Sequence, residues 1–264
     1  MVATLQIVTA VLYFVACAAS GAGFALARPA WNRVAVGVLA AGALAHGASF
    51  SLLHTLDPPP PLTHLPSALS FMAWIGTLGF LLLVWRAKLA GLVVLVAPMS
   101  LLGVLASLSA GRGAVPEESL GAGSLPHAHV LLASAGLALL GLAGLAGALF
   151  LVEHTRLKRK RPPSGGGAWP SLEALDRAGA FAVAAGFPLL TLGVLYGALW
   201  QREASGLLWS GSAHETFCLV AWAIYGALAF QRFGARLPAR RCAMSALAGF
   251  GLLGCAVLGV ELLT

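Results

Sequence analysis

Long apolar segments follow one another along the chain, separated by short polar stretches. Their lengths are near the roughly 20 residues that an α-helix needs to cross a hydrocarbon core of about 30 Å. Alternating strand patterns do not occur between them. The first segment lacks the basic leader of a signal peptide, so we expect it to remain as a helix. The pattern predicts eight spanning helices, at residues 3–27, 33–55, 66–85, 89–110, 129–152, 178–200, 213–232 and 241–262.

The composition supports a protein that lies within a membrane. Of the 264 residues, 59% are hydrophobic and only 9% are charged, and the mean hydropathy is +0.89. So little charge cannot cover the surface of a water-soluble domain of this size. The expected fold class is therefore all-α, a polytopic integral membrane protein whose first partner is the lipid bilayer.

The basic residues fall unevenly between the predicted helices. Of the 16 Lys and Arg residues, only Arg112 and Arg202 lie on one side of the membrane in this arrangement. Because positively charged loops stay in the cytoplasm, we expect both termini outside and a multi-pass protein of a bacterial inner (cytoplasmic) membrane. Anionic lipid at the basic face accounts for the net charge of +7, and no nucleic-acid partner is expected.

One long break interrupts the apolar pattern, at residues 154–177, where basic, Pro and Gly residues gather. We expect a single membrane domain over residues 1–264, with five helices within 1–152, a cytoplasmic linker at 153–177 and three helices within 178–264. Within the linker, Ser171 to Arg177 is predicted to form a short amphipathic turn that enters the sixth helix.

The seven histidines carry most of the chemical information. In the predicted topology six of them lie in the outer half of the membrane or just above it, namely His46, His54, His64, His127, His129 and His214, and only His154 is cytoplasmic. Neutral imidazole is a common ligand of transition metals and haem iron, and an ionisable group inside a membrane is a functional candidate by default. The alternative is a set of interfacial histidines that are hydrogen-bonded to backbone carbonyls.

The spacing of the candidate ligands favours haem over zinc. A zinc site would need ligands at short fixed spacing, as in H-E-x-x-H, and the chain has no such motif. The four cysteines lie in apolar segments without a C-x-x-C pair, so we expect them to pack as small hydrophobic residues. Haem needs only one or two axial imidazoles from different helices, with apolar and aromatic walls.

A polar junction at residues 208–222, LWSGSAHETFCLVAW, has a local explanation. Ser212 and Glu215 form the S-x-x-E pattern of a capping box. Ser212 would accept a hydrogen bond from the amide of Glu215, and the Glu215 carboxylate would reach back to the amide of Ser212. This predicts the start of the seventh helix.

The same junction belongs to a longer stretch, Gly197 to Arg232, that resembles the tryptophan-rich signature of the cytochrome c assembly family of haem-handling membrane proteins (CcsA and CcmC types). The matching residues, in order, are Gly197, Ala198, Trp200, Gly206, Trp209, Glu215, Thr216, Leu219, Trp222, Tyr225 and Arg232. HLPSALSFMAW at 64–74 and HVLLASAGLALL at 129–140 resemble further family segments, the second of which opens with a haem-ligand histidine. The overall plan is most similar to the short, eight-helix HemX-like or YpjD-like branch.

The resemblance implies a haem cofactor, haem b, and together with the placement of the histidines it gives a set of candidate residues that would bind it. The candidate cofactor-binding residues are His129, His46, His214, Trp209, Trp200, Trp222, His127 and His64, and the candidate ligands of the haem iron are His129, His46 and His214.

The sequence also departs from the family pattern. Gly211 to His214 replace the family's Trp-Asp-Pro-Lys, Phe230 stands where a family histidine is expected, and the chain stops at Thr264, before the position of a final histidine. Of the family's ligand histidines that can be placed, only His129 is retained. His214 is one substitute for the missing ligand, and a pair formed by His46 and His129 is the other.

Three functions agree with these observations. The first is binding or handling of haem at the outer leaflet, in cytochrome c maturation or haem homeostasis. The second is a non-catalytic regulator or scaffold of haem-synthesis proteins or other membrane partners, and the third is a carrier of another small ligand. The sequence shows no catalytic triad, carboxylate pair or activated nucleophile, so we expect no enzyme activity of the chain on its own. The oligomeric state is left open.

Overall fold

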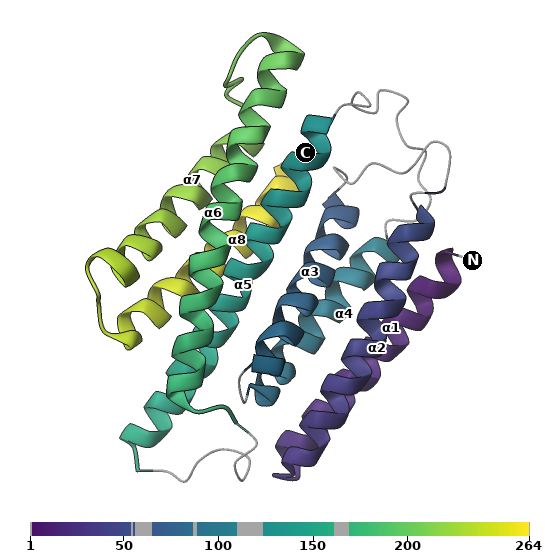
Figure 1. Cartoon of the computed structure of the whole chain (residues 1–264), viewed down its shortest axis with the longest axis vertical. Helices are drawn as coiled ribbons and strands as arrows, with labels where there is room; N and C mark the ends of the chain where they lie inside the picture. Colours follow the sequence, from purple (N-terminus) through teal and green to yellow (C-terminus); the bar gives the residue numbers. More distant parts are fainter. Residues whose placement is uncertain are drawn as a thin grey trace. The chain divides into compact units, whose positions relative to one another are not determined.

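The computed structural model describes residues 2–53, 55, 65–86, 89–109, 124–160 and 169–263 of the chain, and side chains as far as Leu252. Across these ranges it contains eight α-helices, one 3₁₀ turn and one π-helical turn, and no strand (Figure 1). The all-α, polytopic fold class is therefore confirmed. The helices form two compact units, one of residues 1–119 and 152–175 and the other of residues 120–151 and 176–264.

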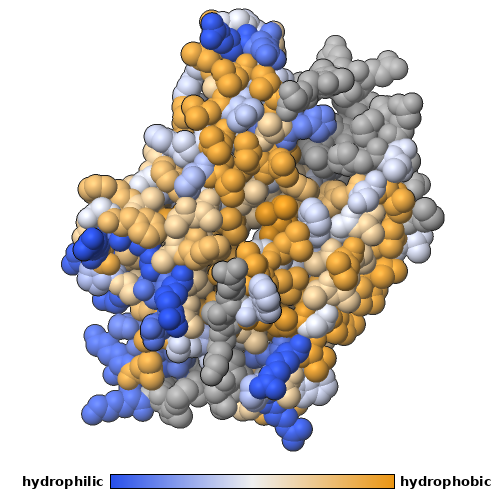
Figure 2. All heavy atoms as spheres, in the orientation of Figure 1, coloured by the Kyte–Doolittle hydropathy of each residue, from blue (hydrophilic) through white to orange (hydrophobic). Residues whose placement is uncertain are grey.

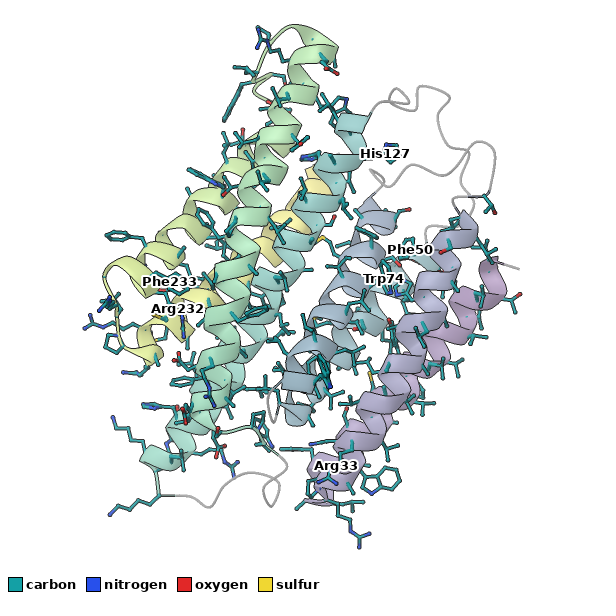
Figure 3. All side chains as sticks on the ribbon, viewed as in Figure 1. Arg33, Phe50, Trp74, His127, Arg232 and Phe233 are labelled. Atoms are coloured by element: carbon teal, nitrogen blue, oxygen red, sulfur yellow. The ribbon has the colours of Figure 1, made fainter. Side chains whose placement is uncertain are left out.

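The first unit is built on four helices. They are α1 (Val2–Ala25), α2 (Pro29–Leu53), α3 (Leu65–Arg86) and α4 (Val93–Ser109), with the 3₁₀ turn η1 (Ala90–Leu92) before α4. Helix α1 packs against α2 and α4, and α3 packs against α4. Aromatic rings join α2 to α3, since the ring centroid of Phe50 lies 5.5 Å from that of Phe71 and 5.7 Å from that of Trp74. Figure 3 shows Phe50 and Trp74.

Helix α1 shows how these helices suit a lipid environment. Its buried positions include Thr9, Tyr13 and Ser20, whereas Val11 and Phe14 are 55% and 63% exposed. This inverts the pattern of a helix in a water-soluble protein, where the apolar face is buried. Apolar residues cover much of the visible surface of the helices (Figure 2), as expected when hydrocarbon is the solvent.

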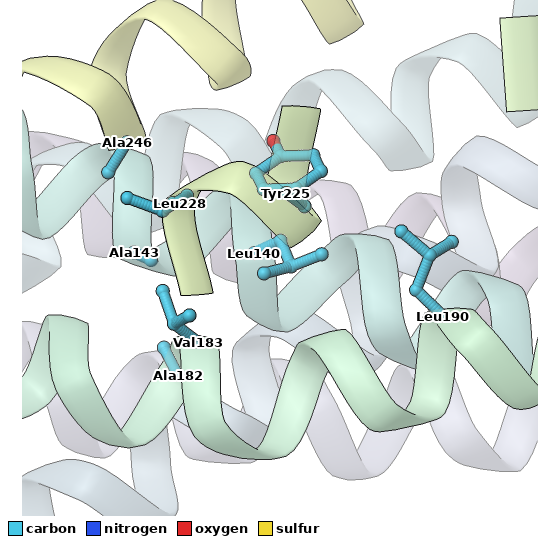
Figure 4. Close-up of a cluster of buried hydrophobic side chains, with 8 residues drawn as sticks. All are labelled: Leu140, Ala143, Ala182, Val183, Leu190, Tyr225, Leu228 and Ala246. Carbon is cyan, nitrogen blue, oxygen red and sulfur yellow. The ribbon is translucent and has the colours of Figure 1, made fainter. Parts of the chain in front are cut away.

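The second unit contains most of the two longest helices, α5 (Ser124–Lys158) and α6 (Leu172–Ser205), and two further helices, α7 (Ala213–Ala229) and α8 (Ala239–Leu263). The π-helical turn η3 (Phe230–Gly234) follows α7. The end of α5 from Val152 and the start of α6 to Leu175 belong to the first unit. Its core brings together Leu140 and Ala143 of α5, Ala182, Val183 and Leu190 of α6, Tyr225 and Leu228 of α7, and Ala246 of α8 (Figure 4).

The predicted helices are confirmed, but several of their starts are wrong. Helix α2 starts at Pro29 instead of residue 33, and α4 starts at Val93 instead of residue 89. Seven helices among the described residues are long and apolar enough to span a membrane, and α8 covers the eighth predicted range. Helix α5 starts at Ser124 instead of residue 129, so it includes His127. Helix α6 starts at Leu172 instead of residue 178. The segment from Ser171 to Arg177 is therefore not a separate turn: the Ser171 hydroxyl accepts from the amide of Ala174 at 3.2 Å and caps a continuous helix.

Candidate functional site

His129 lies near the start of α5 and reaches across to α6. Its Nδ1 is 2.8 Å from the carbonyl oxygen of Gly193. Because a carbonyl oxygen can only accept, Nδ1 carries the hydrogen and donates the hydrogen bond. In the neutral imidazole, Nε2 then keeps its lone pair. The side chain is half-buried. This hydrogen bond therefore selects the tautomer whose Nε2 is able to bind a metal ion.

Two glycines of α6 allow the imidazole to come this close. A Cβ atom at Gly197 would lie 2.7 Å from His129 Nδ1, and one at Gly193 would lie 2.6 Å from the amide nitrogen of Ala133. Both distances are shorter than atoms tolerate, so a larger residue at Gly193 would push the backbones of α5 and α6 apart, and one at Gly197 would displace the His129 ring. The contact was not predicted, although the G-x-x-x-G spacing of Gly193 and Gly197, typical of close helix pairs in membranes, marks it in the sequence.

Aromatic rings stand beside this contact and on the neighbouring helix. The ring centroid of Trp200 lies 6.1 Å from that of His129, with the planes at 42°. Trp222 of α7 donates from Nε1 to the hydroxyl of Thr191 at 3.0 Å, and its ring centroid lies 6.0 Å from that of Phe187. The structure thus brings Trp200 together with His129, and it fixes Trp222 against α6.

Trp209 lies in the loop between α6 and α7, which Glu215 organises. The Glu215 carboxylate accepts from the amide of Ser210 at 2.7 Å, from the Ser210 hydroxyl at 2.9 Å and from the amide of Gly211 at 3.0 Å. Gly211 adopts a φ of +77°, which glycine reaches without strain. The Ser212 hydroxyl accepts from the amide of Glu215 at 3.3 Å, so this half of the capping box is confirmed. The carboxylate reaches further back than predicted, and Trp209 stays 46% exposed.

His46 occupies a closed environment in the first unit, where it is 1% exposed. Its Nδ1 is 3.2 Å from the hydroxyl of Tyr13, and its Nε2 is 2.9 Å from the hydroxyl of Ser70. The ring stacks on Phe50 with centroids 5.1 Å apart. Since both ring nitrogens have partners from other helices, one hydrogen bond would have to break before His46 could bind iron. Its role as a ligand stays a prediction.

The remaining candidates are placed only in part. His127 is an exposed residue in the first turns of α5 (Figure 3). The backbone of His214 lies in the first turn of α7, and its side chain is outside the described residues, as are His54 and His64. His46 belongs to the first unit and His129 to the second, so their pairing around one haem also stays a prediction.

Comparison with known proteins points to one family. The family model described as "Cytochrome C assembly protein" matches residues 62–264, which leaves α1 and α2 outside the match. The chain is similar to the "Cytochrome c biogenesis protein CcsA" of Thermosynechococcus vestitus, with 40% identity over 91 residues, 34% of this chain and 28% of the relative. The corresponding protein of Synechococcus elongatus is 38% identical over 91 residues, with the same coverage of both chains. The aligned part is thus less than a third of the length of these relatives.

Proposed function

Because the chain belongs to the cytochrome c assembly protein family, we propose that it binds or handles haem at the outer leaflet of a membrane, in cytochrome c maturation or haem homeostasis. The observation that carries the proposal is the hydrogen bond from His129 Nδ1 to the Gly193 carbonyl. Relatives with the printed name "Cytochrome c biogenesis protein CcsA" support the biological setting. The membrane is proposed to be the bacterial inner membrane, with other assembly proteins as partners.

The geometry around His129 suits an axial ligand of haem iron. A ligating histidine commonly donates its other ring N–H to a carbonyl or carboxylate, which fixes the orientation of the ring and raises the basicity of the ligand. His129 has the same arrangement, since its Nδ1 donates to the carbonyl oxygen of Gly193. Its Nε2 would hold the iron of haem b, the cargo in this proposal, and Trp200 would provide an aromatic wall for the porphyrin.

The rest of the predicted site extends this proposal. Trp209 is exposed in a loop that Glu215 orders, so its indole is available to the edge of a bound porphyrin. His214 and His46 remain the two candidates for a second iron ligand. The chain's own contribution is binding and orientation, and no bond-making step is assigned to it.

The proposal is tested by the haem content of the purified full-length protein. Absorption spectra are recorded as isolated and after reduction with dithionite, and haem is quantified as the pyridine haemochrome. We expect a Soret band with near-stoichiometric haem, and we expect His129→Ala to lose most of it. The matched control is His154→Ala, at the other end of the same helix, which should keep the haem.

A colourless protein that also fails to take up added haem would contradict the proposal. It would favour the role of a regulator or scaffold for haem-synthesis or other membrane proteins. Uptake of haem that is unaffected by His129→Ala would instead leave haem handling in place and remove His129 from the site.

A further inference from the structure

The turn between α7 and α8 carries a concentrated positive charge at the end of a membrane span. The span that includes α7 ends at Gly234, and α8 begins at Ala239. Four arginines lie between residues 232 and 241, whereas no Asp or Glu occurs between Glu215 and Glu261. The charge therefore lies where a chain leaves the hydrocarbon and enters the headgroup layer.

One of the four arginines is neutralised within the protein. The Arg232 guanidinium donates to the Asp176 carboxylate at 2.6 Å and to the carbonyl oxygen of the same residue at 2.6 Å. Arg236, Arg240 and Arg241 are exposed, and in the part of the chain that the structure describes no carboxylate pairs with them. Three positive charges are thus left for a partner outside the chain.

The backbone of the turn is held in place by hydrogen bonds. The amide of Ala235 donates to the carbonyl of Phe230 at 2.9 Å, and the amide of Leu237 donates to the carbonyl of Gln231 at 2.9 Å. The side-chain oxygen of Gln231 accepts from the Ser245 hydroxyl of α8 at 2.8 Å. The arginines are therefore presented from an ordered backbone, which reduces the conformational entropy lost on binding.

Exposed aromatic side chains lie in the same turn as the arginines. Phe230 is 69% exposed and Phe233 is 50% exposed, and both belong to η3, where Figure 3 shows Phe233 next to Arg232. Exposed aromatic rings at a membrane boundary contact the upper part of the acyl chains. The turn therefore presents cationic groups and apolar rings together, which matches a molecule with a phosphate group and hydrocarbon chains.

We propose that this basic turn, defined as Arg236, Arg240, Arg241, Phe230 and Phe233, binds an anionic phospholipid. The arginines bind the headgroup phosphate, and the two phenylalanines contact the acyl chains. An acidic protein segment would pair with the arginines but would not contact the two phenylalanine rings, whereas a phospholipid would contact both. The place of the turn at the end of a span and the exposed rings favour the phospholipid. This site is independent of haem binding at His129.

The test measures lipid binding to the full-length protein in a neutral detergent. Phosphatidylglycerol and phosphatidylcholine with the same acyl chains are titrated, and bound lipid is counted by native mass spectrometry. The variant R236Q/R240Q/R241Q is compared with K158Q/R159Q/K160Q, which removes the same charge from the exposed end of α5. Equal thermal unfolding of both variants in phosphatidylcholine checks that each is folded.

The expected result is preferential binding of phosphatidylglycerol by the natural protein and by the α5 control. Each arginine near a lipid surface contributes about a fivefold change in affinity, so the triple variant should bind phosphatidylglycerol on the order of a hundredfold more weakly. F230S/F233S should weaken binding of the long-chain lipid and leave glycerol 3-phosphate binding unchanged.

Three outcomes would overturn the proposal. The first is an equal loss of phosphatidylglycerol binding in the two charge variants, which would indicate a general charge effect. The second is competition by glycerol 3-phosphate that is as strong as competition by the lipid, which would indicate a site for a free phosphate ester. The third is arginine-dependent binding of a polyglutamate peptide without binding of phosphatidylglycerol, which would indicate an acidic protein partner.

Discussion

The carbonyl oxygen of Gly193 accepts a hydrogen bond from His129 Nδ1 at 2.8 Å. The contact joins α5 to α6 and leaves the imidazole lone pair on Nε2. A hydrogen bond to a backbone carbonyl is also what a purely structural histidine would make. The two roles differ in what Nε2 does: a ligand histidine binds iron through Nε2, and a structural histidine does not.

Replacement of Gly197 by Ala should displace the His129 ring. The new Cβ would lie 2.7 Å from Nδ1, and overpacking of this kind costs about 1–3 kcal/mol. We expect a lower unfolding temperature in detergent and a marked loss of bound haem, measured as the pyridine haemochrome. Gly179→Ala on the same helix is the control, because nothing lies within 4 Å of its added Cβ. Full haem content in Gly197→Ala would show that the close fit is not needed.

The Trp209 loop should depend on Glu215. Glu215→Ala removes the acceptor for the amides of Ser210 and Gly211, so these amides should exchange their hydrogens faster. Hydrogen-exchange mass spectrometry of a peptide that covers the loop measures this directly. Glu203→Ala, an exposed acid at the end of α6, should leave the exchange unchanged. Identical exchange in the two variants would mean that the loop is ordered by other contacts.

Tyr13 and His46 should stabilise the first unit together. Tyr13→Phe removes the hydroxyl 3.2 Å from His46 Nδ1 and leaves a buried ring nitrogen without that partner. Hydrogen bonds between membrane helices contribute about 0.6 kcal/mol on average and up to about 1.7 kcal/mol, so we expect a loss in this range in detergent unfolding experiments. Tyr196→Phe, on a half-buried tyrosine of α6, is the control. A loss no larger than in the control would argue against the buried hydrogen bond.

Arg232 should anchor the α7–α8 turn to α6. Its guanidinium makes two hydrogen bonds of 2.6 Å to Asp176, and bonds to charged groups contribute about 1.5–3 kcal/mol. Arg232→Gln should therefore lower the free energy of unfolding by about this amount. Arg236→Gln, an exposed arginine of the same turn, should have little effect on stability in lipid-free detergent. Equal losses of unfolding free energy in the two variants would show that the hydrogen bonds of Arg232 to Asp176 do not anchor the turn.

The existence of the helices was predictable from the sequence, and some of their ends were not. A run of about 20 apolar residues leaves few structures other than a helix in lipid, because the backbone must satisfy its own hydrogen bonds. Helices α5 and α6 continue beyond their apolar runs, to Lys158 and back to Leu172. In these parts the hydrophobic signal ends while the helical hydrogen bonds continue.

The candidate site was predictable in its residue types and not in its contacts. His129 and Trp200 are found from the histidine pattern and the tryptophan-rich signature. The acceptor at Gly193 depends on the rotation of α6 against α5, which no local pattern fixes. The two partners of His46 come from α1 and α3. Such contacts follow from packing between segments that are distant in the sequence.

The most direct test of the central claim is whether His129 itself ligates haem iron. His129→Gly removes the imidazole and leaves space for a free one, so the absorption spectrum is recorded for this variant with and without added imidazole. We predict that the variant loses the Soret band of the natural protein and that imidazole restores it, while His154→Gly keeps the band throughout. An unaltered spectrum of His129→Gly without imidazole would contradict the assignment of His129 as the iron ligand.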